Sequence, residues 1–156
     1  MPSESNLTTE KLGSPRVTQF SVFLPNKVGA LLHVVRLLNE HHIDVLAVNV
    51  QDSADTAIVR IVVSDPESVQ TLFLESAVAF SVCELVVVEL REGATELGRL
   101  LAALLAAECN IFGSSALLTR PRGRAALALH VEDNECAISV LQSQQFTILG
   151  QSDISR

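Results

Sequence analysis

The sequence contains the same unit twice, and this repeat constrains the fold more than any other feature. Residues 22–31 align with residues 88–97 at a constant offset of 66 positions. At this offset the apolar helical positions of the two copies coincide: Leu31, Val34, Val35 and Leu38 fall on Leu97, Leu100, Leu101 and Leu104. Residues 64–67 match residues 132–135 at an offset of 68, a slip that a hairpin tip absorbs. A chain of 156 residues, long enough for one ordinary domain, is therefore predicted to form two small ones.

Each copy is predicted to run in the order strand, helix, strand, strand, helix, strand. The i, i+3, i+4, i+7 spacing of the aligned apolar residues is typical of a helix that packs by one face. Asp65 is a predicted N-cap, with Pro66 at the first helical position. The predicted strands of the first copy are residues 17–24, 43–51, 57–64 and a last strand that begins near residue 80. In the second copy we expect strands near residues 85–90, 111–119, 124–132 and 146–150, and helices near 95–108 and 134–144.

This element order predicts an α+β fold of two ferredoxin-like βαββαβ domains side by side. Each would have an antiparallel sheet with its helices on one face. We expect a disordered N-terminal tail at residues 1–16, a first domain at 17–84 and a second at 85–152. No stretch rich in Gly, Pro or Ser separates residues 80 and 90, so the domains should be held rigidly against each other.

The predicted sheets are apolar on both faces, as residues 58–63 and 85–88 show. A sheet with helices on one side exposes its other face, and an apolar face of this size implies further packing. We therefore predict a homodimer. A small-residue face on the first helix of the second copy suits close helix contact, although good helix propensity explains it equally well; its members are Ala102, Ala103, Ala106 and Ala107.

Composition excludes several classes of function. The net charge of −7 argues against partners recognised by their phosphates, namely nucleic acids and anionic membranes. No apolar stretch approaches the ~20 residues that span a bilayer. The three cysteines form no CxxC pair, so we expect reduced thiols and a cytoplasmic protein. No residue pattern indicates a cofactor or a metal.

Other activities of the predicted fold lack their residues. The strand at 125–129 offers no aromatic side chains for stacking RNA bases, and the first loops offer no CxxC for a soft metal. An acylphosphatase-like site would have only Arg91 as a candidate. Neither a nucleophile motif nor a phosphate loop is present, so an enzyme is the least favoured class.

The loop between the first strand and first helix of copy one is more informative, since it exposes amides at a helix N-terminus. It resembles the first turn of the ACT domain, Asp-x-Pro-Gly-x-Leu. Asn26 stands at the Asp position, Val28 at the Pro, Gly29 at the Gly and Leu31 at the Leu. Residues 42–45 and 109–111 resemble the Gly-Ile-Asn-Ile step into the second strand of that family. The resemblance covers residues 17–152 and extends to stand-alone proteins made of two ACT domains.

The resemblance implies a site and a mode of pairing. In that family the domains pair side by side through the second strand and first helix, and amino acids bind between the first loop of one domain and the second strand of the other. Carried onto this sequence, the copy-one site comprises Asn26, Val28, Gly29, Ala30 and Leu31 opposite Phe112, Ser114 and Ser115. A second site would comprise Glu92, Gly93, Ala94 and Thr95 opposite Asp44 and Ala47. Copy two has Ala94 and Thr95 where the family has Pro and Gly, which weakens the case for this second site.

The residues themselves are compatible with amino-acid binding. The amides of residues 29–31 suit an α-carboxylate, and Asn26 Oδ1 suits an α-ammonium. Asn26 and Gly29 are also ordinary turn residues, and Ser114 and Ser115 are either ligand donors or simply polar strand positions. The expected function is a non-catalytic regulatory or sensor protein that binds a small amino acid and passes the bound state to a partner enzyme or other protein. The alternative is a ligand-free structural or protein-interaction module of the same fold.

Overall fold

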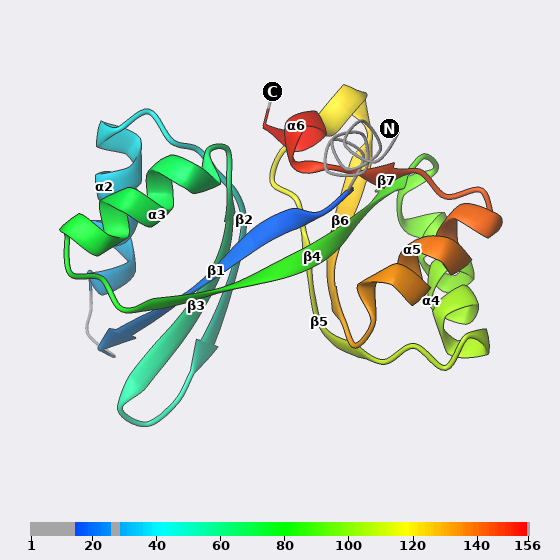
Figure 1. The fold of residues 1–156 in the computed structure, drawn as a ribbon, viewed down its shortest axis with the longest axis horizontal. Helices are drawn as coiled ribbons and strands as arrows, with labels where there is room; N and C mark the ends of the chain where they lie inside the picture. The colour runs from blue at the N-terminus through cyan, green and yellow to red at the C-terminus, as the bar shows by residue number, and fades with distance from the viewer. Residues whose placement is uncertain (1–14, 26–28, 156) are drawn as a thin grey trace, which may run out of the picture.

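The computed structural model describes residues 15–25 and 29–155. The first copy has the predicted order of elements, with its two helices together at one end of the molecule (Figure 1). Its elements are β1 (Val17–Pro25), α2 (Ala30–Glu40), β2 (Val45–Asp52), β3 (Thr56–Val63), α3 (Pro66–Glu75) and β4 (Phe80–Leu90). The predicted N-terminal tail lies outside the described residues as far as residue 14. Arg16, the last residue of that predicted tail, is described and forms ion pairs with Glu84 at 2.8 Å and Glu135 at 3.2 Å.

The second copy departs from prediction in several places. Its first helix divides into a 3-10 turn and an α-helix, and its last strand has two residues where we expected five. After β4 its elements are η1 (Gly93–Glu96), α4 (Leu97–Ala106), β5 (Ile111–Ala116), η2 (Pro121–Gly123), β6 (Ala125–Val131), α5 (Asn134–Ser143), β7 (Ile148–Leu149) and α6 (Gln151–Ile154). Strand β5 ends at Ala116, where we expected a strand to about residue 119, and the short helices η2 and α6 were not predicted. The short β7 pairs with β4 at Val87 and Val88, and the chain then turns into α6.

One long strand, β4, joins the two copies. Its first half pairs with β1 as far as Leu85, and its second half pairs with β6 from Val86 onward. The strands therefore form one antiparallel sheet in the order β2-β3-β1-β4-β6-β5, with β7 also on β4. This explains why no linker sequence separates the copies, because the last strand of one continues as the first strand of the other.

The backbone repeats as the sequence does. Left-handed residues follow the first helix of each copy at His42 and Glu108, and the second helix at Ala77 and Gln145. These pairs have offsets of 66 and 68, the same offsets that align the sequence. The fold is two βαββαβ units with an antiparallel sheet, so the predicted ferredoxin-like fold class is confirmed.

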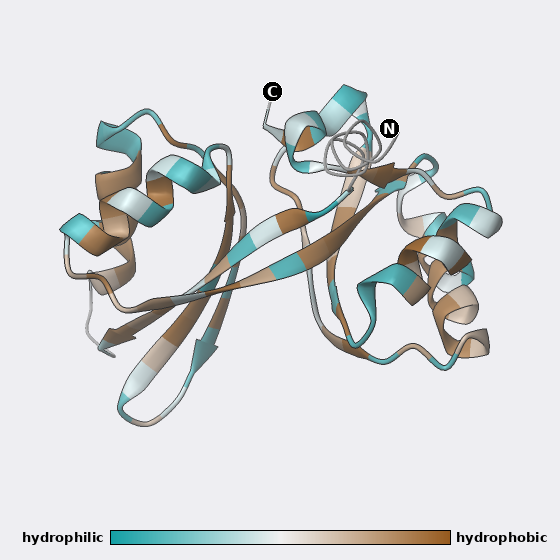
Figure 2. Ribbon diagram, in the orientation of Figure 1, coloured by the Kyte–Doolittle hydropathy of each residue, from teal (hydrophilic) through white to brown (hydrophobic). Residues whose placement is uncertain are grey.

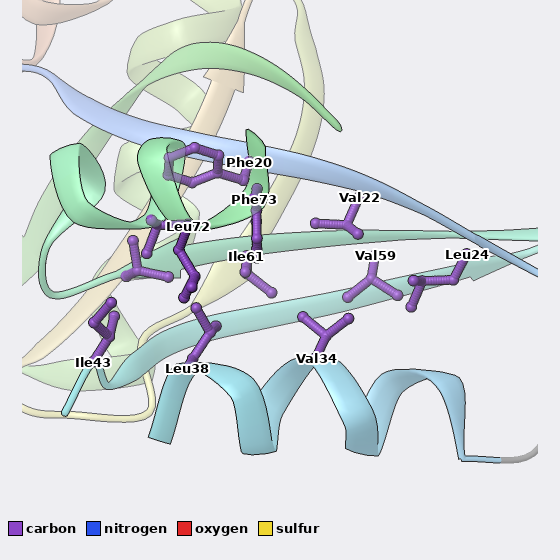
Figure 3. Packing of buried hydrophobic residues seen from close by; sticks show 12 residues of the cluster. Phe20, Val22, Leu24, Val34, Leu38, Ile43, Val59, Ile61, Leu72 and Phe73 are labelled. Atoms are coloured by element: carbon purple, nitrogen blue, oxygen red, sulfur yellow. The ribbon is translucent and has the colours of Figure 1, made fainter. Parts of the chain in front are cut away.

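Each copy has its own core between its helices and one face of the sheet. The copy-one core is centred on Phe20 and Phe73 (Figure 3), whose rings meet edge to face with centroids 5.8 Å apart. The Phe80 ring lies beside both, with centroid distances of 5.8 Å and 5.6 Å. The copy-two core is aliphatic around Leu100 and Leu141. Alternation along the strands places these side chains on the helix-facing side of the sheet.

A third cluster fills the opposite face of the sheet, where strands of both copies meet. Apolar colour runs along these central strands in Figure 2. The members of this interdomain cluster are Val17, Leu46, Ala47, Val62, Leu85, Val87, Ala126, Ala128, Leu149 and Ile154. Much of the sheet face from which we predicted a homodimer is thus covered within one chain, so that face no longer argues for a dimer.

The edge strands β2 and β5 approach each other across this cluster. The backbone N–H of Leu118, just after β5, donates to the carbonyl of Leu46 at 2.7 Å. The first helices do not meet, since α2 and α4 lie at opposite ends of the molecule (Figure 1). The resemblance implied that the two domains contact each other through their second strands and their first helices. Within one chain, the expected contact between the first helices is wrong. None of the described helices is long and apolar enough to cross a membrane.

Candidate functional site

The loop that enters α2 turns on a glycine. Gly29 is the N-cap of α2 and has φ +91°, a left-handed conformation that side chains with a Cβ rarely adopt. A Cβ added there would meet nothing within 4 Å, so the backbone angle, not crowding, is what favours glycine. Asn26 and Val28, also predicted for this site, lie outside the described residues.

Among the described residues no side chain caps the N-terminus of α2, and the first turn of this helix carries no acidic residue. The second helix of each copy differs, because Asp65 accepts from the Ser68 amide and Asp133 from the Cys136 amide. The first amides of a helix have no partners within it and lie at the positive end of its dipole. Among the described residues no side chain therefore occupies the first amides of α2.

A pocket of about 500 Å³ lies beside this helix start. Gly29, Ala30 and the turn between α3 and β4 line it. The full lining among the described residues is Phe23, Leu24, Pro25, Gly29, Ala30, His33, Val34, Ser76, Ala77, Val78 and Ala79. Most of these side chains are apolar, so the pocket suits an aliphatic group next to the open amides.

The structure does not bring the two halves of the predicted copy-one site together within one chain. Phe112, Ser114 and Ser115 line a different cleft, which shares no lining residue with the pocket beside Gly29. The reason is the shared β4, which carries copy two away from the end of the sheet where α2 begins (Figure 1). In a single chain these strand residues cannot face Gly29 or Ala30.

The corresponding loop of copy two is occupied by its own side chains. Glu96 Oε1 accepts from the Glu92 amide at 3.0 Å, and Thr95 Oγ1 donates to the Glu92 carbonyl at 2.9 Å. Gly93 has φ +65°, and residues 93–96, including Ala94, form the 3-10 turn. The hydrogen bond from Glu92 to Glu96 ties the copy-two loop to itself at the amide that aligns with residue 26, whereas no side chain caps the start of η1 or of α4.

The residues predicted to oppose that loop lie elsewhere. Ala47 is buried in the interdomain cluster, and Asp44 bonds through its backbone to Ser64. Neither lines the pocket of about 230 Å³ beside the copy-two loop. Both site pairings drawn from the resemblance therefore fail within one chain, and for the same geometric reason.

A buried carboxylate lies at the end of β4, next to the copy-two loop. Glu89 is 2% exposed, and its Oε2 is 3.7 Å from both Arg91 Nε and Arg124 Nη1. Its Oε1 has no hydrogen-bond partner among the described residues. The guanidinium groups of Arg91 and Arg124 balance the negative charge of Glu89. The acidic and basic side chains at this end of β4 therefore pair largely with one another.

Sequence reasoning missed a polar cleft of about 350 Å³ between the two copies. One wall comes from copy one and the other from copy two. Its lining residues are Gln19, Asn49, Gln51, Arg60, Phe112, Gly113, Ser114, Ser115, Ala128 and His130. The available signal was strand alternation, since Gln19 and Arg60 share the face of Val17 and Val62, opposite the helices.

The thiols show no sign of metal binding or activation. The three cysteines are free, and burial raises the pKa of both the Cys83 and Cys109 thiols. At Cys83 a hydrogen bond from Gln19 and the charge of Arg60 act in the opposite direction and only reduce this rise. Within residues 15–25 and 29–155, no group of three or more His, Cys, Asp or Glu residues could hold a metal ion.

Comparison with solved structures shows that this architecture is shared. Protein BT0572 from Bacteroides thetaiotaomicron has a TM-score of 0.82 and 24% identity over 92% of this chain and 99% of that one. The ligand-free regulatory subunit of aspartate kinase from Thermus thermophilus has a TM-score of 0.57 and 13% identity over 83% of this chain and 90% of that one. At these identities the likeness establishes the fold. No curated protein matches by sequence.

Fold and loop together define a tandem pair of ferredoxin-like domains that share a central strand. The family model described as "ACT domain pair" matches residues 16–114, which include all of copy one and part of copy two. The chain belongs to the ACT domain pair family, as the first turn of copy one indicated.

Proposed function

We propose that this chain is a regulatory protein that binds a small amino acid beside the N-terminus of α2 and passes the bound state to a partner protein. The observation that carries the proposal is the open start of α2 beside a mainly apolar pocket of about 500 Å³. Its amides would receive the α-carboxylate, and the apolar wall would receive the side chain. A relative of the same fold is named as the regulatory subunit of aspartate kinase.

In this proposal the chain is not an enzyme, and any regulated activity belongs to the partner. Binding acts by stabilising one conformation, because a ligand shifts an equilibrium only by its differential affinity for the two states. Within the copy-one loop, Asn26, Val28, Gly29, Ala30 and Leu31 form the proposed site. The strand residues Phe112, Ser114 and Ser115 would reach it only from a second copy of the chain.

We also propose that two copies associate through α4. This helix carries an exposed row of leucines at i, i+4 and i+8, in which Leu105 is 78% exposed. Leu97 and Leu101 complete the row, and Ala102 and Ala106 extend it. An apolar helix face of this kind is uncommon on a monomer. Sedimentation equilibrium tests this assembly and should give twice the chain mass of 16.8 kDa. The double variant Leu101→Glu, Leu105→Glu should give the mass of one chain. A wild-type protein with the mass of one chain would contradict the assembly.

Scanning calorimetry with each of the twenty proteinogenic amino acids tests the binding proposal. At least one should raise Tm, because a ligand at 100 times its Kd adds ~2.7 kcal/mol to the free energy of unfolding. Gly29→Val should abolish that shift, since a β-branched residue cannot hold φ +91° without strain. Thr95→Val, at the aligned position of copy two, is the matched control and should retain it.

The alternative function is a ligand-free structural or protein-interaction module. It is supported by the copy-two loop, which keeps the fold while its own carboxylate occupies it. If no amino acid at millimolar concentration raises Tm, this alternative replaces the binding proposal. If a shift occurs but survives Gly29→Val, the binding site lies elsewhere.

A further inference from the structure

The polar cleft between the two copies has the composition of a site for an anion. It contains one fixed positive charge, Arg60, and no aspartate or glutamate among its described lining residues. Whereas the whole chain has a net charge of −7, this cleft is lined by a guanidinium, amides, hydroxyls and an imidazole. An anion would find donors there and no like charge.

Arg60 is held in place but not neutralised. Its Nη1 donates to Gln51 Oε1 at 2.9 Å, which leaves most donors of the guanidinium free. No described carboxylate lies within ion-pair distance of it, whereas Arg16, Arg91, Arg99, Arg122 and Arg124 each pair with an acid. A planar guanidinium with free donors binds a carboxylate through two parallel hydrogen bonds.

The rest of the copy-one wall is also polar and ordered. Gln19 is only 5% exposed, and its Nε2 donates to Cys83 Sγ at 3.4 Å. Asn49 lies opposite Arg60 in the register of β2 and β3. The Gln19 side chain thus supplies a positioned amide to the copy-one wall, and Asn49 lies on the neighbouring strand.

Copy two supplies the facing wall. Ser115 pairs with Ala128, and Gly113 with His130, in the register of β5 and β6. The His130 ring packs edge-on against Phe112 with centroids 5.4 Å apart, which holds the imidazole in the cleft. Hydroxyl and imidazole groups suit a second polar group on the ligand, so a ligand that spans the cleft would contact both copies.

We propose that this cleft binds a small organic anion with two carboxylates, or with a carboxylate and a hydroxyl, and that Arg60 binds a carboxylate. The absence of an acidic group among the described lining residues favours such an anion over a zwitterionic amino acid, whose ammonium would need a negative partner. The site is separate from the pocket beside Gly29, with which it shares no described lining residue. By joining the two walls, the ligand would hold β2 and β5 together.

Calorimetry with 10 mM succinate or L-malate at constant ionic strength tests this assignment. Either anion should raise Tm of the wild-type chain, and Arg60→Gln should weaken the affinity about tenfold or more, because hydrogen bonds to charged groups are strong. The matched control is Arg36→Gln, which removes an exposed arginine of copy one that forms no ion pair with any described residue. Ser115→Ala should weaken binding from the opposite wall without altering the charge.

Three outcomes would overturn the assignment. Neither anion raises Tm; Arg60→Gln retains the wild-type shift; or inorganic phosphate raises Tm as much as the dicarboxylates do, which would show a general anion effect. Should Arg60→Gln fail to fold by circular dichroism, Ser115→Ala and Arg60→Lys, which keeps the charge but loses the planar fork, decide the question. Gly29→Val should leave the succinate or malate shift unchanged, so this site and the amino-acid site fail independently.

Discussion

The first loops of the two copies occupy equivalent places in the fold and differ in the contacts that their own side chains make. In copy one the helix begins at Ala30 after a left-handed glycine, with no side-chain cap among the described residues. In copy two Glu96 stands at the position of Ala30, and its carboxylate accepts from the Glu92 amide. The copy-two loop is therefore held by a carboxylate of its own, whereas the described part of the copy-one loop has no such contact.

This difference shows how one repeated fold can separate stability from binding. A helix start without a side-chain cap lacks the stabilising hydrogen bond that a cap makes, and its backbone N–H groups remain free to donate to a ligand. The second helices of both copies are capped alike by Asp65 and Asp133, so the asymmetry is confined to the first loops.

Substitutions in the two cores should have the largest effects on stability, and they test whether the two copies unfold together. Phe73 in copy one and Leu141 in copy two are aligned at the offset of 68 and are both fully buried. Phe73→Ala should lower the free energy of unfolding by about 3–5 kcal/mol and Leu141→Ala by about 2–5 kcal/mol. Because β4 belongs to both copies, each variant should lower Tm of one shared transition, measured by calorimetry.

An exposed substitution serves as the control for these core variants. Leu74→Ala, next to Phe73 but 68% exposed, should change stability by less than about 1 kcal/mol. The contrary result would be two unfolding transitions in either core variant, one of which keeps about half of the unfolding enthalpy at the original Tm. That result would mean that the two copies unfold independently, and it would contradict the single cooperative transition inferred from the shared strand β4.

The helix caps provide an intermediate test, in which the copies should behave alike. Asp65→Ala removes the acceptor of the Ser68 amide, and Asp133→Ala removes that of the Cys136 amide. Each should cost about 1 kcal/mol in urea denaturation. Asp55→Ala, in the exposed hairpin turn, is the control and should cost less than ~0.5 kcal/mol. Clearly unequal losses at the two caps would contradict the structural equivalence of the copies.

The smallest expected effect comes from opening the copy-two loop. Glu96→Ala removes the acceptor of the Glu92 amide and an ion pair with Arg99 whose N–O distance is 3.4 Å. We expect a loss of about 0.5 kcal/mol, because the hydrogen bond is exposed and surface ion pairs contribute little. Thermal denaturation measures it. A loss above ~2 kcal/mol would mean that the loop supports the fold rather than merely closing an amide.

Local signals made much of the fold predictable. Asp65 and Pro66 mark the start of α3, the apolar spacing gives α2, and the repeat gives the second copy. The division of the helix at residues 95–108 was not predictable from apolar spacing, since it depends on the Glu96 carboxylate and on Gly93 at φ +65°.

The site was predictable only where it is local. The Gly29 turn depends on a few neighbouring residues, and its resemblance to the ACT domain identified the family. The facing strand residues depend on how two domains are placed, which in this chain is decided by the continuous β4. Likewise Arg60 on β3 and His130 on β6 are 70 positions apart in the sequence, and they line one cleft only because the edge strands β2 and β5 approach each other.

Amide chemical shifts test the central claim, that the copy-one loop is open to a carboxylate and the copy-two loop is closed. ¹⁵N–¹H spectra would be recorded while the amino acid with the largest calorimetric shift is added. We predict saturable shifts of the Ala30, Leu31 and Leu32 amides, and unchanged positions for residues 92–96. Shifts confined to residues 92–96, or equal in the two loops, would contradict the account.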